Sequence, residues 1–134
     1  MNPAIWYVAA GSAAGGMTRF LLTGAFQQRF APGGGFPVGT MLVNITGSLL
    51  LGFLIRWLLE VPSVSPELRA LLTTGFCGGY TTFSTFSHDT VALIEQGDWK
   101  RALLYMALSV GVSLLAVVAG MVLARDMMAW RRGG

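Results

Sequence analysis

The chain has 134 residues, of which 54% are hydrophobic and only 11% are charged, and its formal net charge is +3. A soluble domain carries about 25% charged residues, so this composition excludes an ordinary soluble protein, and the small net charge gives no support for binding nucleic acid. The single cysteine, Cys77, excludes an internal disulfide. We therefore expect one membrane domain covering residues 1–134.

Hydrophobic stretches long enough to cross a bilayer predict an all-α membrane protein with four transmembrane helices. In chain order they cover about residues 5–26, 38–59, 68–94 and 102–124. The first stretch ends in polar and charged residues instead of a small-residue cleavage site, so we interpret it as a retained span. The connectors at 31–35, 62–66 and 95–100 are short, and neighbouring helices are therefore expected to pack antiparallel.

Positive charge gives only a weak signal of orientation in the membrane. In this topology the N-terminus, the second connector and the C-terminus share one side. That side holds Arg56, Arg69, Arg125, Arg131 and Arg132, whereas the opposite side holds Arg29, Lys100 and Arg101. The positive-inside rule leaves two alternatives open: a single orientation set by the C-terminal arginines, or insertion in both orientations with an antiparallel dimer.

Small residues along the predicted spans favour close helix packing and assembly. Gly11 and Gly15 form a small-xxx-small element, which Ser12 and Gly16 continue, and such rows let helix backbones approach closely. Further small positions are Gly47, Ser48, Gly111 and Gly120. Four short helices leave little room for a pathway, so we expect a homodimer.

Residues 75–87, GFCGGYTTFSTFS, place glycines and hydroxyls in the middle of the third span. This combination predicts a helix broken inside the membrane, and such breaks usually contact an ion or a substrate. We expect the break at Gly78 and Gly79, where unwinding would free backbone carbonyls that bind Na⁺ or K⁺. The alternative is a tight helix crossing that requires glycine.

Polar side chains in the second and fourth spans are candidates for a pathway. Asn44 offers two amide donors, and it either bonds to another helix or points a donor into a pathway. Tyr105, Ser109 and Ser113 follow at i, i+4 and i+8, so they share one helical face. Isolated serines often bond back to their own helix. A row of tyrosine and two serines along one face instead favours a continuous polar surface that lines a pathway.

Phe83 and Phe86 share a face in the middle of the hydroxyl-rich segment. Core packing is the ordinary role of such a pair. An aromatic ring also has a positive edge, against which a small, hard anion can lie, and Ser84 and Thr85 would add hydroxyl donors beside it.

Charged residues inside the spans are rare, and their types exclude common enzyme chemistry. Arg19 either snorkels to the nearer interface or forms an electropositive vestibule for anions. Asp89, beside His88, lies near the end of the third span. The chain offers no catalytic triad, no basic neighbour that would activate Cys77, and no Cys/His cluster for zinc. We predict that the protein is not an enzyme.

Taken in order, these elements resemble the Fluc fluoride channels, also called CrcB proteins. Residues 15–19 are similar to the family's first-helix Gly…Arg element, 39–47 to its second-helix motif, and 75–87 to its GG-x-TTFSTFS signature. Two positions depart from the pattern. Asp89 stands where Glu is frequent, and Tyr80 stands where a smaller or apolar residue is common.

The resemblance implies a passive, fluoride-selective channel in a bacterial inner membrane, through which cytoplasmic F⁻ leaves down its gradient. It also implies a dual-topology antiparallel homodimer with a structural Na⁺ at its centre, held by the backbone carbonyls of Gly78 and Thr81. The implied pore residues are Asn44, Phe83, Ser84, Thr85, Phe86, Tyr105, Ser109 and Ser113, with Arg19 in the vestibule.

Two other classes of function remain as alternatives. A small proton-coupled exporter can also be a four-span, dual-topology dimer, but it depends on a membrane-embedded carboxylate in an early span, and span 5–26 contains Arg19 and no acid. A non-transporting membrane scaffold would need only the small-residue interfaces and would leave Asn44 without a role.

Overall fold

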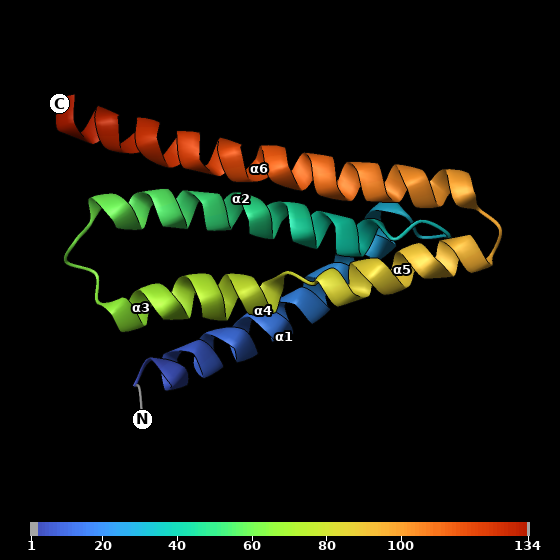
Figure 1. The fold of residues 1–134 in the computed structure, drawn as a ribbon, viewed down its shortest axis with the longest axis horizontal. Helices are drawn as coiled ribbons and strands as arrows, with labels where there is room; N and C mark the ends of the chain where they lie inside the picture. The colour runs from blue at the N-terminus through green and yellow to red at the C-terminus, as the bar shows by residue number, and fades with distance from the viewer. Residues whose placement is uncertain (1–2, 134) are drawn as a thin grey trace.

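The computed structural model describes residues 3–133, which are almost entirely helical (Figure 1). The elements are α1 (Ala4–Phe30), α2 (Val38–Glu60), α3 (Pro66–Ala70), the π-helix η1 (Leu71–Cys77), α4 (Gly78–Tyr80), α5 (Phe83–Glu95) and α6 (Trp99–Gly133). Because α3, η1 and α4 follow one another without a gap, they form one half of the third predicted span, and α5 forms the other half. The helical fold with a broken third span is confirmed, whereas the dimer stays a prediction.

The outer surface of the protein is apolar, as expected of a membrane protein. Within the described residues, α2 and α6 are long and apolar enough to cross a membrane, with mean hydropathies of 1.9 and 2.4 over their most apolar windows. Only 28% and 11% of these windows are buried, which is unlike the core helices of a soluble protein. Large side chains such as Phe20 and Leu115 are 80% and 70% exposed.

Helices α2 and α6 run in the same direction and make the most extensive helix contact of the fold (Figure 1). Close packing is possible because Gly52 lies against the backbone of Val117, and Gly120 lies against the carbonyl of Leu49. The start of α1, the connector from α2 to α3 and the end of α6 lie at one end of the molecule (Figure 1). This arrangement agrees with the predicted four-span topology.

Helix α1 packs against η1 and α4 through glycine. A Cβ atom at Gly11 would overlap the carbonyl of Leu71, and one at Gly15 would overlap the carbonyl of Phe76. The expectation that Gly11 and Gly15 serve assembly between chains is therefore wrong, because the chain's own third span already occupies this face. Gly16, one residue further on, has nothing within 4 Å of its Cβ position.

The break in the third span lies at Thr81 and Thr82, so the predicted break at the glycine pair is wrong. Gly78 is helical, with φ −65° and ψ −37°, whereas Thr81 (ψ 159°) and Thr82 (ψ 117°) are extended. The alternative role of glycine, a tight helix crossing, is confirmed for Gly79, where a Cβ would come within 2.6 Å of the carbonyl of Ser12. β-branched side chains favour the extended backbone that the threonines adopt.

Helix α6 continues beyond the predicted end of the fourth span at residue 124. Its 35 residues correspond to about 52 Å at 1.5 Å per residue, which exceeds the ~30 Å hydrocarbon core. An ion pair connects this extension to α2: Glu60 at the end of α2 pairs with Arg132 at 2.9 Å, and also with Arg56 of its own helix at 2.8 Å.

Candidate functional site

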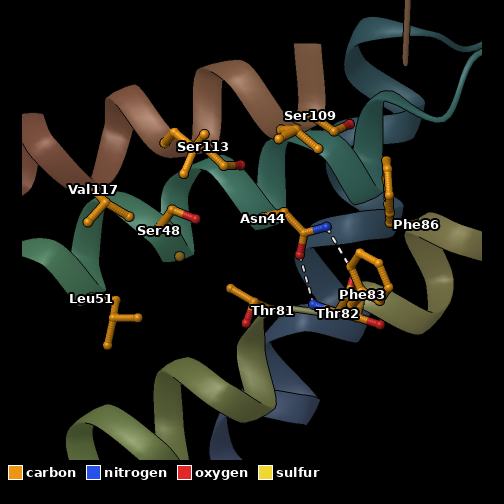
Figure 2. A pocket seen from close by; sticks show the side chains of 13 residues that line it. Asn44, Ser48, Leu51, Thr81, Thr82, Phe83, Phe86, Ser109, Ser113 and Val117 are labelled. Atoms are coloured by element: carbon orange, nitrogen blue, oxygen red, sulfur yellow. Dashed lines mark hydrogen bonds between the residues drawn. The ribbon is translucent and has the colours of Figure 1, made fainter. Parts of the chain in front are cut away.

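The side-chain amide of Asn44 pairs with the backbone at the helix break. The Thr82 N–H donates to Asn44 Oδ1 at 2.7 Å, and Asn44 Nδ2 donates to the Thr82 carbonyl at 3.0 Å (Figure 2). This pairing satisfies a peptide that no helix satisfies, as the membrane interior requires. An amide nitrogen carries two N–H groups, and the second has no partner within residues 3–133. Asn44 thus bonds to another span, which is one of the two alternatives for this residue, and keeps one free donor.

The Thr82 hydroxyl forms the N-cap of α5. It accepts from the Thr85 N–H at 3.2 Å and lies 3.0 Å from Thr85 Oγ1 and 3.1 Å from Ser84 Oγ. Such a cap satisfies one of the free amides at a helix start. Ser84 and Thr85 are exposed on the first turn of α5, so their hydroxyls belong to this cap cluster.

A groove of about 310 Å³ lies between α2, α6 and the helix break (Figure 2). Its lining residues are Asn44, Gly47, Ser48, Leu51, Thr81, Thr82, Phe83, Phe86, Ser109, Val110, Ser113, Leu114 and Val117. Three separate spans therefore bring five of the predicted pore residues together, namely Asn44, Phe83, Phe86, Ser109 and Ser113. None of the charged side chains of residues 3–133 lines this groove.

Tyr105 lies beside the groove instead of lining it. Its ring is fully buried between Phe86, at 5.3 Å between ring centroids, and Phe36, at 5.7 Å. Its hydroxyl donates to Asp89 Oδ2 at 3.3 Å. Tyr105 consequently separates the groove from the surroundings of Asp89.

Asp89 lines a second, more polar cavity of about 360 Å³ near the connector from α1 to α2. The lining residues are Gln27, Gly35, Phe36, Pro37, Thr40, Asp89, Ala92, Leu93 and Gln96. The His88 ring is 3.6 Å from the Asp89 carboxylate and is 82% exposed. Arg19 lines neither cavity and forms no hydrogen bond or ion pair with the described residues, so the structure does not bring it to the groove.

The carbonyls of Gly78 and Thr81 lack their usual helical donors. In a continuous helix they would accept from the amides four residues later. The Thr82 N–H instead donates to Asn44, and the Thr85 N–H donates to the Thr82 hydroxyl. Gly78 is exposed, with nothing within 4 Å of its Cβ position. Free backbone carbonyls are suitable ligands for Na⁺, so these residues fit the expected ion.

Two polar side chains of the groove, Ser48 and Thr82, were not among the predicted pore residues. Ser48 follows Asn44 by four residues, which places both on the same face of α2; this spacing was a usable signal. The role of Thr82 depends on its pairing with a residue 38 positions away, which no local pattern indicates.

Comparison with known proteins agrees with this description. The family model described as CrcB-like protein, Camphor Resistance (CrcB), matches residues 6–121. A Rhizobium meliloti protein named fluoride-specific ion channel FluC is 48% identical over 123 residues, covering 92% of this chain and 97% of that protein. Proteins of the same name from Nitrobacter winogradskyi and a Sulfurihydrogenibium species are 45% and 42% identical, each over 88% of this chain and covering 92% and 94% of those proteins. The chain therefore belongs to the CrcB family.

Proposed function

We propose that this protein is a passive, fluoride-selective channel of a bacterial inner membrane that works as an antiparallel, dual-topology homodimer. The observation that carries the proposal is the uncharged groove at the helix break, where Asn44, Ser109 and Ser113 meet Phe83 and Phe86. The relatives named fluoride-specific ion channel support the choice of ion.

The chemistry of the groove suits an anion that holds its water tightly. A pore must replace that water with small donors, and it must still bind weakly enough to release the ion. The free N–H of Asn44 and the hydroxyls of Ser109 and Ser113 are such donors. The edges of the Phe83 and Phe86 rings, whose centroids are 5.5 Å apart, add partial positive charge. Since no lysine or arginine of the described residues lines the groove, none of them places a full positive charge there to trap the ion.

The carbonyls of Gly78 and Thr81 would hold a structural Na⁺. When bound, this ion would supply a fixed positive charge at the helix break, where the dimer would have its centre. The exposed position of Gly78 leaves its carbonyl accessible to a second copy of the chain.

Ion efflux from reconstituted liposomes tests the proposed function. Vesicles are loaded with fluoride or with chloride, a voltage shunt is added, and efflux is followed with and without a proton gradient. We expect fast fluoride efflux that needs no proton gradient, and little chloride efflux. Efflux of both anions at similar rates would contradict selectivity, and dependence on the proton gradient would support the proton-coupled exporter.

A further inference from the structure

Three serines that line the groove lack the hydrogen bond to their own helix that several other helical hydroxyls of the protein form. Serine and threonine in helices commonly donate to the carbonyl four residues earlier. Thr18, Thr46, Thr73, Ser87 and Thr90 each form this bond, at 2.8 or 2.9 Å. Within residues 3–133, Ser48 and Ser113 form no hydrogen bond. The buried Ser109 hydroxyl lies near that of Tyr105 without a well-aligned hydrogen bond to it. A buried hydroxyl without a partner is costly, which favours an occupant of the groove beside Ser109 and Ser113. The hydroxyl of Ser48, which is half-buried, is also unbonded and available to that occupant.

The free hydroxyls of the three serines and the free N–H of Asn44 lie in two layers along the groove. Asn44 and Ser48 are one turn apart on α2, and Ser109 and Ser113 are one turn apart on α6, so each turn of about 5.4 Å carries one polar pair. Figure 2 shows Ser48 and Ser113 on these two helices, between the Asn44 end of the groove and the apolar side chains of Leu51 and Val117.

The polar groups offered to the groove favour an anion over a cation. The oxygen of the Asn44 amide already accepts from the Thr82 N–H, whereas one N–H of this side chain is unbonded and can donate to an ion in the groove. Hydroxyls can also donate, and no carboxylate from the described part of the chain lines the groove. Every polar side chain of the two layers, Asn44, Ser48, Ser109 and Ser113, can therefore offer a donor to a small anion.

We infer that Ser48 is a further anion-coordinating residue, which forms with Ser113 a second position for the ion one helical turn beyond Asn44 and Ser109. The inference rests on the proposed function of the groove. Ser48 belongs to α2 and faces a residue of α6, so the second position, like the first, has a donor from each of the two helices. An ion that leaves Asn44 would then not have to regain water inside the groove.

The test measures fluoride efflux from liposomes for Ser48→Ala, Ser48→Cys and a matched control, Ser87→Ala. We expect Ser48→Ala to slow fluoride efflux about tenfold, the size of one lost hydrogen bond to a charged group. Ser48→Cys keeps nearly the same volume but is a weak donor, so efflux should remain slow. Ser87→Ala removes a hydroxyl that already donates to the Phe83 carbonyl, and it should conduct like the unmodified protein.

The remaining outcomes of these efflux measurements distinguish failure of the inference from failure of the proposed function. Normal efflux through Ser48→Ala, or its restoration by Ser48→Cys, would overturn the inference and leave the proposed function intact. Equal slowing by Ser87→Ala would overturn it as well, because loss of any hydroxyl would then suffice. Absence of fluoride efflux in the unmodified protein would overturn both the inference and the proposed function.

Size exclusion is the control for folding: a slow variant that elutes like the unmodified protein is folded. If Ser48→Ala fails to fold, Ser113→Ala, which changes the opposite donor, should slow efflux similarly.

Discussion

The Asn44 side chain and the Thr82 peptide form a two-hydrogen-bond pair across the helix break, with N···O distances of 2.7 and 3.0 Å. The pair lets the third span interrupt its helix in an apolar surrounding, because both polar groups of the Thr82 peptide have partners. It also draws the Thr82 amide away from Gly78 and so frees the Gly78 carbonyl. Asn44 thereby stabilises the break and leaves free a backbone carbonyl that is proposed to bind Na⁺.

Asn44→Ala should destabilise the protein and abolish fluoride flux. The Thr82 N–H and carbonyl would both lose their partner, at a cost of about 1–3 kcal/mol each. Asn44→Asp is the matched variant, because it keeps an acceptor for the Thr82 N–H and loses the donor. It should lose less stability than Asn44→Ala but conduct no better, since a carboxylate in the groove repels an anion. Thermal unfolding in detergent and liposome efflux measure the two effects, and equal stability of both variants with the unmodified protein would contradict this role.

Gly15→Ala should prevent tight packing of α1 on the third span, because its Cβ would overlap the Phe76 carbonyl and lie 2.8 Å from the Tyr80 amide. Overpacking of this kind costs about 1–3 kcal/mol, and a backbone neighbour cannot rotate away. Gly16→Ala is the control, since open space surrounds its Cβ position and alanine favours helix by about 0.5–1 kcal/mol. A lower midpoint of thermal unfolding is expected for Gly15→Ala alone; equal midpoints would exclude the packing argument.

The sequence was sufficient to predict the helices and insufficient to place the break. Apolar runs and turn-rich connectors predicted α2 almost to the residue, 38–59 against Val38–Glu60. The glycine pair suggested local unwinding, but Gly79 packs on Ser12 and the extended residues are those paired with Asn44 and capping α5. Contacts between distant residues decide such positions, and intrinsic backbone preference does not reveal them.

The role of Tyr80 also depends on contacts with residues distant in the sequence. The sequence marked it only as a departure from the family pattern. In the fold its hydroxyl is 2.8 Å from Thr46 Oγ1, and its ring lies against Gly47, where a Cβ would come within 2.9 Å of it. The small residue of α2 thus provides the space that the large residue of α4 fills. The groove residues Asn44, Ser109 and Ser113 could be predicted because polar groups inside a span are already unusual.

Removal of Na⁺ should impair assembly or flux if the carbonyls of Gly78 and Thr81 bind this ion in the active protein. We expect purification in N-methyl-D-glucamine salts to reduce fluoride efflux or to shift the protein to a smaller species on size exclusion, because unpartnered carbonyls would remain at the break. Returning Na⁺ should restore both properties, while an equal concentration of choline should not. Full activity and an unchanged elution volume without Na⁺ would argue against a structural ion.

Phe86→Ile should slow fluoride flux several-fold while leaving assembly intact. Isoleucine keeps an apolar side chain of similar bulk but has no positive ring edge to face an anion. The cost in stability should be about 0.5–1.5 kcal/mol, because the ring contact with Tyr105 at 5.3 Å is lost. Phe83→Ile separates the effect of a ring on fluoride flux from its effect on stability. Phe83 is 77% exposed, so its replacement should slow flux with almost no loss of stability. Unchanged fluoride efflux in Phe86→Ile would remove this residue from the pathway, whatever its effect on thermal unfolding.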